Sequence, residues 1–297
     1  MLAAYNEMKA TEKGRAMSER VNDPANNVMD VADVVVWEKE IAASGTPLAE
    51  LMVRAGQAVA SYANDLLFEG DPLQPFNDKL VIPSVVDARK TAKKIMILCG
   101  SGNNGGDGWV AAQELGDQGY NVTLVSKVPA SELIVEPART NALKADASSE
   151  FEVVIDPGAE DLAALLNSAD LIIDAILGTG FAHDTVREPY NEWIKLANAA
   201  CERCAMNEAH EGTTANTSLS NVSDDGECVD DLLESHNTKI LAVDCPSGLN
   251  AQTGQPASDC IKADLTVTML AIKTGLIQPS AASFIGDLAL AELDISN

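Results

Sequence analysis

Basic residues and histidines are scarce in this chain of 297 residues. Twenty Lys and Arg stand against 45 Asp and Glu, which gives a formal net charge of -25. A surface of this sign repels nucleic acid and anionic membranes, so we expect neither as a partner. The chain has only three histidines, His183, His210 and His236, which argues against a Cys-His or Ser-His-Asp mechanism.

Long apolar runs are also missing, since none approaches the roughly 18 residues that a membrane-spanning helix needs. The first nine residues lack the charged start and apolar core of a signal peptide. The six cysteines show no spacing typical of a secreted disulfide framework. A cytoplasmic protein is therefore predicted.

The hydrophobic pattern predicts an α/β fold behind a polar, aperiodic lead at residues 1–28, which we expect to be disordered. Two helices come first, one with Val31, Val34, Glu38 and Ile41 at helical spacing and one over residues 48–62. Strands and helices then alternate, which is typical of a mostly parallel sheet covered by helices on both faces. The predicted strands are 94–98, 122–125, 153–155, 171–176, 240–243 and 265–270, and the predicted helices are 107–118, 137–147, 160–167 and 189–200.

Residues 201–238 interrupt this alternation with nine acidic residues and one arginine. The segment shows no periodicity, so it is predicted to be an acidic, disordered surface insertion. Cys201, Cys204, His210 and Cys228 are potential zinc ligands, but their spacing matches no familiar zinc site. A solvated loop with reduced thiols is the preferred interpretation.

A glycine-rich segment follows the strand at 94–98. Gly100, Gly102 and Gly105 have the G-x-G-x-x-G spacing of a dinucleotide-binding turn. Such a turn is usually followed, about 20 positions later, by an acidic residue that binds the ribose. Here the next strand leads to Lys127 instead, which would support only binding of the 2′-phosphate of NADP. Asp107 would also repel a pyrophosphate at the start of the following helix.

Oxygen-bearing side chains make this segment suitable for a cation or a hydroxyl-rich ligand. Asn103, Asn104 and Asp107 stand within five residues of one another, and Asp174 and Asp244 end two other buried strands. Carboxyl ends of parallel strands meet at one edge of a sheet, so the three acids are predicted to share a site. Each acid alone could equally be a helix-entry or turn residue.

Three motifs together resemble the signature loops of the NAD(P)H-hydrate epimerases, the YjeF N-terminal domain family. They are NNGGDG at 103–108, DAILGTG at 174–180 and VDCPSG at 243–248. LMVRAG at 51–56, KADLTVT at 262–268 and KTG at 273–275 extend the resemblance. It implies a Rossmann-like three-layer αβα sandwich and a single epimerase domain over residues 29–297. Val53 departs from the family, which usually has an acidic residue there.

The resemblance implies that the protein interconverts the R and S hydrates of NADH and NADPH (NADHX and NADPHX). Asp244 would be the catalytic, proton-transferring group. One K⁺ per subunit would be bound by Asn104, Asp174 and Ser247. The substrate-binding residues implied are Asn103, Asn104, Gly105, Gly106, Asp107, Gly178, Thr179, Gly180, Phe181 and Asp244.

Three further residues have two interpretations each. Thr266 and Thr268 would line the pocket floor, or are ordinary strand threonines. Lys273 would face a phosphate, or is a solvated lysine.

The family also implies a homodimer and a separate ATP- or ADP-dependent dehydratase that consumes the S form. The chain stops at Asn297 with no room for a second domain of typical size, so a partner or a missing segment would supply the dehydratase. Two other functions stay open: an NADP-dependent oxidoreductase that uses the glycine turn conventionally, and a non-catalytic nucleotide-binding module.

Overall fold

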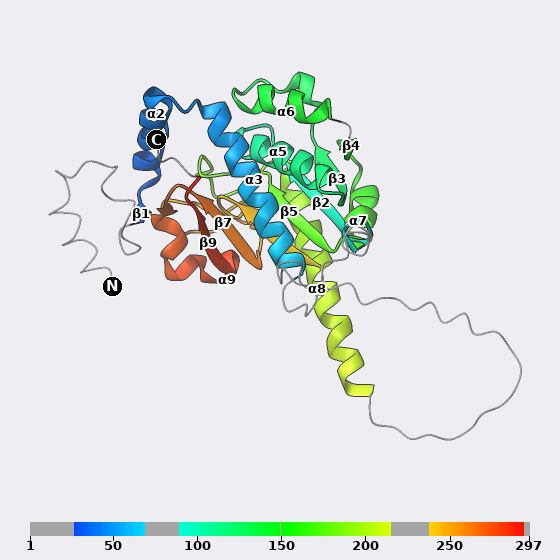
Figure 1. The fold of residues 1–297 in the computed structure, drawn as a ribbon. Coiled ribbons are helices and arrows are strands. Elements are labelled where there is room, and N and C mark those ends of the chain that lie inside the picture. Colours follow the sequence, from blue (N-terminus) through cyan, green and yellow to red (C-terminus); the bar gives the residue numbers. More distant parts are fainter. Residues whose placement is uncertain (1–26, 69–88, 149, 215–237, 294–297) are drawn as a thin grey trace, which may run out of the picture.

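The computed structural model describes residues 27–68, 89–148, 150–214 and 238–293 (Figure 1). In this part of the chain, seven strands form one sheet in the order β4-β3-β2-β5-β6-β7-β9, and every neighbouring pair is parallel. The strands are β2 (Lys94–Cys99), β3 (Asn121–Ser126), β4 (Glu152–Ile155), β5 (Leu171–Ala175), β6 (Lys239–Val243), β7 (Leu265–Met269) and β9 (Asp287–Ala291).

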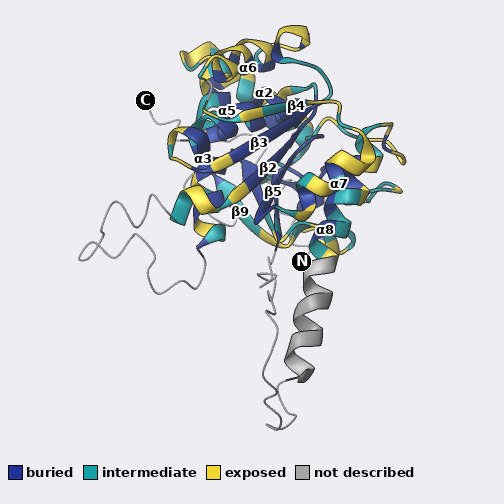
Figure 2. Cartoon of the chain, turned by 90° about the vertical axis from the view of Figure 1, so that its right-hand side faces the viewer, coloured by how far each residue is buried: buried dark blue, intermediate teal, exposed yellow. Residues whose placement is uncertain are grey.

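Helices cover both faces of this sheet (Figures 1 and 2). The central strand β2 shows why, because its alternate side chains enter two separate cores. Ile95 and Ile97 pack with the first helix layer, whereas Met96 and Leu98 pack with the second. The first layer holds α2 (Val31–Ser44), α3 (Leu48–Leu67), α5 (Asn103–Asp117) and α6 (Ala138–Asp146), and the second holds α7 (Ala159–Asn167) and α8 (Tyr190–Thr214). The prediction of a three-layer αβα sandwich is confirmed.

The strand order reverses direction between β2 and β5. From β2 the chain builds outward through β3 and β4, then returns to the other side of β2 with β5 and continues through β6 and β7. In open α/β sheets, a crevice forms beyond the carboxyl ends of the strands at such a point. The segments that follow β2 and β5 therefore lie on either side of this crevice.

Two short strands lie outside the main sheet. β1 (Val28–Met29) pairs with β8 (Ile272–Lys273) in parallel. Residues 1–26 lie outside the described residues, so the disordered lead stays a prediction there. Val28, the last residue of the predicted lead, belongs to β1. This pairing holds the start of α2 against the chain that follows β7.

The structure differs from the predicted elements in several places. The helix expected from residue 107 begins at Asn103, because packing overrides the poor helix propensity of two glycines. The acidic segment was wrongly expected to be aperiodic from Cys201, since α8 continues to Thr214; residues 215–237 lie outside the described residues. Strand β9 was not predicted, because its sequence DLALA contains little that favours a strand. The strand expected to end at Ile176 ends at Ala175.

Candidate functional site

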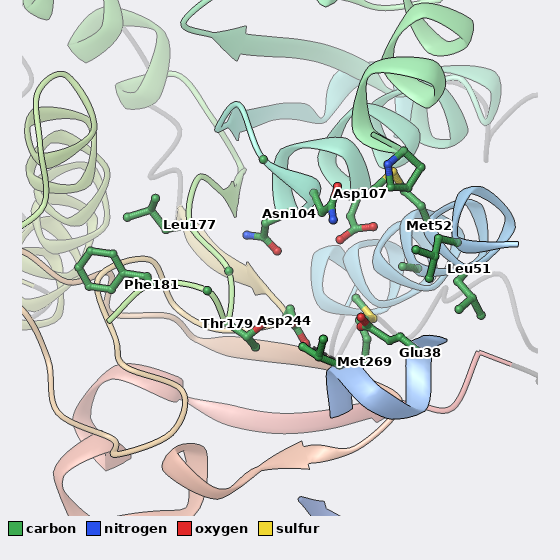
Figure 3. A pocket seen from close by; sticks show the side chains of 18 of the residues that line it. Glu38, Leu51, Met52, Asn104, Asp107, Leu177, Thr179, Phe181, Asp244 and Met269 are labelled. Carbon is green, nitrogen blue, oxygen red and sulfur yellow. Dashed lines mark hydrogen bonds between the residues drawn. The ribbon is translucent and has the colours of Figure 1, made fainter. Parts of the chain in front are cut away.

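A cavity of about 740 Å³ lies beyond the carboxyl ends of the strands, which is within the usual range for small-molecule sites of roughly 300–1,000 Å³. All three predicted loops reach it. Residues on its wall that were predicted to bind substrate are Asn103, Asn104, Asp107, Gly178, Thr179, Gly180, Phe181 and Asp244. Figure 3 shows Asn104 and Asp107 extending from α5 toward the side where Thr179 and Asp244 lie. The predicted convergence of the loops is therefore present in the structure.

The two remaining predicted substrate residues, Gly105 and Gly106, do not line this cavity. A Cβ atom on Gly105 would lie 1.9 Å from the Gly100 carbonyl oxygen, and one on Gly106 would lie 2.6 Å from Met52 Sδ. Both glycines are buried within the first turns of α5. Their local role is to let α5 start directly against the end of β2 and against α3.

Asp174 and Ser247 lie buried beside the cavity and bind each other. The Ser247 hydroxyl donates to Asp174 Oδ1 at 2.5 Å, and the Ser247 N–H donates to Oδ2 at 2.7 Å. Burial raises the pKa of Asp174 to about 6, although the hydrogen bonds from Ser247 and Ile176 lower it. The Asp174 carboxylate thus lacks enough positive charge around it within the described residues to balance its burial.

Asn104 has an unusual environment for a buried amide. Neither its Oδ1 nor its Nδ2 has a hydrogen-bond partner among the described residues. Its side chain lies close to Gly178, where an added Cβ would be 3.3 Å from Oδ1. A buried polar atom without a partner is costly, which indicates that a ligand completes this environment.

The oxygen atoms of Asn104, Asp174 and Ser247 are donors that suit a hard cation. In the described ranges, no group of three or more His, Cys, Asp or Glu could hold a metal. A cation at this place would therefore need the amide oxygen of Asn104 and the hydroxyl oxygen of Ser247 beside the carboxylate of Asp174. Cys228, one of the four potential zinc ligands, lies outside the described residues. The residues present therefore fit a monovalent or other hard cation.

Asp244 follows β6 directly and reaches the cavity from a tight turn. Its φ is 65°, and the next N–H, of Cys245, donates to the Val243 carbonyl at 2.7 Å. Aspartate adopts this left-handed conformation more readily than most residues. Leu270 on the cavity wall has the same feature, with φ 62° and a 2.6 Å hydrogen bond across it from Ala271 to Met269. Two strained turns therefore shape one side of the cavity.

Lys273 contacts Asp244 from inside the protein. It is 1% exposed, and its Nζ forms an ion pair with Asp244 Oδ1. Both earlier interpretations of this lysine, phosphate-facing and solvated, are therefore wrong. Thr268 also donates to Asp244 Oδ1, at 3.3 Å, whereas the Thr266 hydroxyl donates to the Ile285 carbonyl at 2.7 Å, and neither threonine lines the cavity.

Glu38 on α2 is a cavity residue that no motif predicted. Burial raises its pKa, and the nearby Asp244 carboxylate raises it further. Burial also raises the pKa of Asp107 well above its usual range, with further contributions from Asp244 and Glu38. An available signal was the position of Glu38 on the otherwise apolar face of its helix. The cavity thus holds two carboxyls whose pKa is raised beside one that is paired with a lysine.

Aromatic side chains form another part of the wall. Phe181 and His183 pack edge to face with ring centroids 5.9 Å apart, and the Tyr190 hydroxyl lies 3.0 Å from Ser101 Oγ. Such surfaces suit a planar ring of a ligand. Lys127, the residue that supported an NADP-dependent oxidoreductase, is absent from the cavity wall and binds Asp156 at 2.9 Å.

The fold and the site define a Rossmann-like α/β protein with an acidic cavity at the strand ends. The family model described as YjeF-related protein N-terminus matches residues 48–275, and the chain belongs to this family. A crystal structure of the yeast protein ynu0 (YNL200c) has the same fold, with a TM-score of 0.57 and 19% identity over 89% of this chain and 86% of that chain.

Curated relatives carry names from nicotinamide nucleotide repair. An NAD(P)H-hydrate epimerase of Cenarchaeum symbiosum is 32% identical over 69% of this chain and 76% of its own length. A bifunctional NAD(P)H-hydrate repair enzyme of Leishmania braziliensis is 33% identical over 67% of this chain, and one of Escherichia coli is 29% identical over 89%. The matched region spans only 28% and 39% of those two relatives. Within the described residues, no helix is both long enough and apolar enough to cross a membrane.

Proposed function

We propose that this protein interconverts the R and S forms of hydrated NADH and NADPH. The main observation in support of this function is that the 103–107 segment, the 178–181 turn and Asp244 all reach one cavity. The name of the Cenarchaeum symbiosum relative, which matches most of both chains, supports this reaction. The aromatic part of the wall supports binding of a ligand with planar rings.

The substrate carbon bears a hydroxyl group and is bonded to the ring nitrogen. Its inversion requires its bond to oxygen or to nitrogen to break and to form again. Either course moves one proton in each direction between the substrate and the protein. Asp244 is the proposed proton-transferring group, because its carboxylate reaches the cavity while Lys273 holds it from behind.

K⁺ is the proposed cofactor, with Asn104, Asp174 and Ser247 as its side-chain ligands. Support comes from the unpartnered amide of Asn104 and from the buried Asp174 carboxyl. A bound cation would supply a fixed positive charge next to an otherwise acidic cavity. The 178–181 turn lies close to Asn104 and would therefore lie close to the bound cation.

We further propose that the protein acts as a homodimer in the cytoplasm and supplies the S form to an ATP- or ADP-dependent dehydratase. The bifunctional names of several relatives support a link to a second activity. The free, buried thiols of Cys99, Cys245 and Cys260 suit a reducing compartment.

The test uses a mixture of R and S NADPH hydrates, a purified S-specific dehydratase, ATP and K⁺, with HPLC to follow both forms. The dehydratase alone should stop when S is exhausted, and addition of this protein should make R disappear as well. Persistence of R with folded protein present would contradict the proposal. Tight NADP binding without epimerisation would then favour an oxidoreductase, and binding of the hydrate alone would favour a non-catalytic module.

A further inference from the structure

Lys273 is a buried cation directly behind the proposed proton-transferring carboxylate. Its side chain is 2% exposed and does not line the cavity, whereas that of Asp244 is 16% exposed and does. Parallel pairing of Lys273 with Met29, through β8 and β1, fixes its backbone. The lysine therefore does not contact a ligand in the cavity directly, whereas Asp244, which it touches, does line the cavity.

The contacts of Lys273 use all the donors of its ammonium group. Nζ donates to Asp244 Oδ1, to Thr268 Oγ1 at 3.1 Å and to the Met269 carbonyl at 2.8 Å. An ammonium has three protons, so no donor is left for a substrate. This geometry excludes direct phosphate binding by Lys273 in the observed arrangement.

The hydrogen bonds to Asp244 are all formed by one of its two carboxylate oxygens. Oδ1 accepts from Lys273, from the Met269 N–H at 3.1 Å and from Thr268. The hydrogen bonds found within the described residues all use Oδ1 and none uses Oδ2, while Asp244 itself lines the cavity. Hydrogen bonds to the charged form of a carboxyl group, together with a cation, favour ionisation.

We propose that Lys273 is a positioning residue that keeps Asp244 in its proton-accepting form and directs one carboxylate oxygen toward the substrate. This inference rests on the proposed epimerase function. Glu38 on α2 and Asp107 on α5 are the other carboxyl groups near Asp244, which contributes to the raised pKa of each, and Lys39 is a further cation near Glu38. Among these cations, Lys273 is the one that forms an ion pair with Asp244.

Activity should show this effect in its pH dependence. The test compares wild type with Lys273→Gln, which keeps polar contacts but removes the charge, and measures kcat and KM on the R hydrate between about pH 5 and 9. We expect kcat at neutral pH to fall about 10- to 100-fold and the acid limb of its pH profile to move up by about one unit or more. KM should change less than about threefold, because Lys273 does not line the cavity.

Two variants test charge as the cause. Lys273→Arg should return the acid limb toward that of wild type, since it keeps the cation. Lys262→Met, which removes an exposed lysine that binds Glu202 at 2.9 Å, should leave kcat, KM and the limb unchanged. A folded Lys273→Gln variant with an unmoved limb and a raised KM would overturn the proposal.

Two further measurements keep the outcome decisive. If Lys273→Gln does not fold, Thr268→Val takes its place, because it removes a hydroxyl that contacts both Asp244 and Lys273. This variant should move the acid limb of the pH profile in the same direction by a smaller amount. An unmoved acid limb in Thr268→Val would overturn the proposal. The ¹³C NMR titration of Asp244, assigned with Asp244→Asn, reads ionisation without any substrate. If wild type lacks epimerase activity, the proposed function fails, and this titration still decides whether Lys273 keeps Asp244 ionised.

Discussion

At the scale of single residues, the cavity divides its carboxyl groups by environment. Asp244 contacts a buried lysine, whereas Glu38 and Asp107 have their pKa raised by burial and by neighbouring carboxylates. Carboxyl groups with opposed environments in one site can serve as proton acceptor and proton donor at the same pH. The division therefore places carboxyl groups of two different environments in one cavity, which His183 also lines.

The Asp244–Lys273 pair should be strongly coupled in stability. Removal of one partner leaves a buried charge, so Asp244→Asn and Lys273→Met should each lower the free energy of unfolding by about 3–5 kcal/mol. The double variant should lose clearly less than the sum of the single losses, because it removes both charges. Chemical denaturation of the four proteins measures this cycle, and additive losses would contradict a direct pairing.

Glu38 should make the stability of the protein depend on pH. Its pKa is raised in the folded state, so its stabilising contribution is complete below the pKa of the unfolded chain and is lost as pH rises through the folded value. Glu38→Gln should therefore be more stable than wild type at neutral pH, and this difference should shrink as pH falls toward about 4. Thermal melts across this range measure it.

The matched control for this prediction is Glu40→Gln on the same helix, because Glu40 is exposed and does not line the cavity. Its melting temperature should follow that of wild type at every pH. An equal gain in both variants would mean that the overall negative charge, and not the cavity, is responsible.

At the scale of elements, the first turn of α5 is where the fold and the site depend on each other. The helix begins at Asn103 directly after β2, and this brings Asn104 and Asp107 to the cavity. Gly105 allows the close approach, because a Cβ there would overlap the Gly100 carbonyl. A shifted helix would move both polar side chains together.

Gly105→Ala should therefore lower stability by about 3 kcal/mol or more, because the overlap involves backbone that cannot rotate away. Gly102→Ala is a suitable comparison, since a Cβ at that position meets nothing within 4 Å. Its cost should stay below about 1 kcal/mol, as expected for a changed N-cap. Denaturant unfolding of both variants measures the difference, and similar losses would contradict this account of the helix start.

At the scale of the whole molecule, the net charge of -25 affects any test of the proposed K⁺ site. Repulsion among so many acids should be reduced by every salt, so added KCl would stabilise the protein even without a specific site. The specific effect requires a comparison of cations at one ionic strength.

We expect K⁺ to stabilise wild type more than tetramethylammonium does, by about 1–3 kcal/mol when its concentration is 10–100 times the Kd. Asp174→Asn and Ser247→Ala should lose this difference but keep the general stabilisation by salt, because the surface charge is almost unchanged. Thermal melts at constant ionic strength measure both effects. Equal stabilisation of wild type by the two cations would contradict the K⁺ proposal.

The sequence predicted the features that depend on neighbouring residues. Short continuous apolar runs indicated the central strands, and the glycine and acid motifs placed Asn104, Asp107 and Asp244 at strand ends. The parallel strand order then brought these motifs together, as the α/β pattern predicted. The continuous apolar run of β2 also indicated that both of its faces are buried, as they are in the three layers.

The tertiary structure alone decided what lies behind and across from these motifs. Lys273 meets Asp244 across 29 positions of sequence. It lies on β8, which pairs with β1, and neither of these two-residue strands has a detectable pattern. Glu38 reaches the cavity because α2 lies over it, which depends on packing between distant segments. Sequence by itself determined which side chains could do the chemistry, whereas long-range packing determined their charge partners and burial, and these set how readily each one holds a proton.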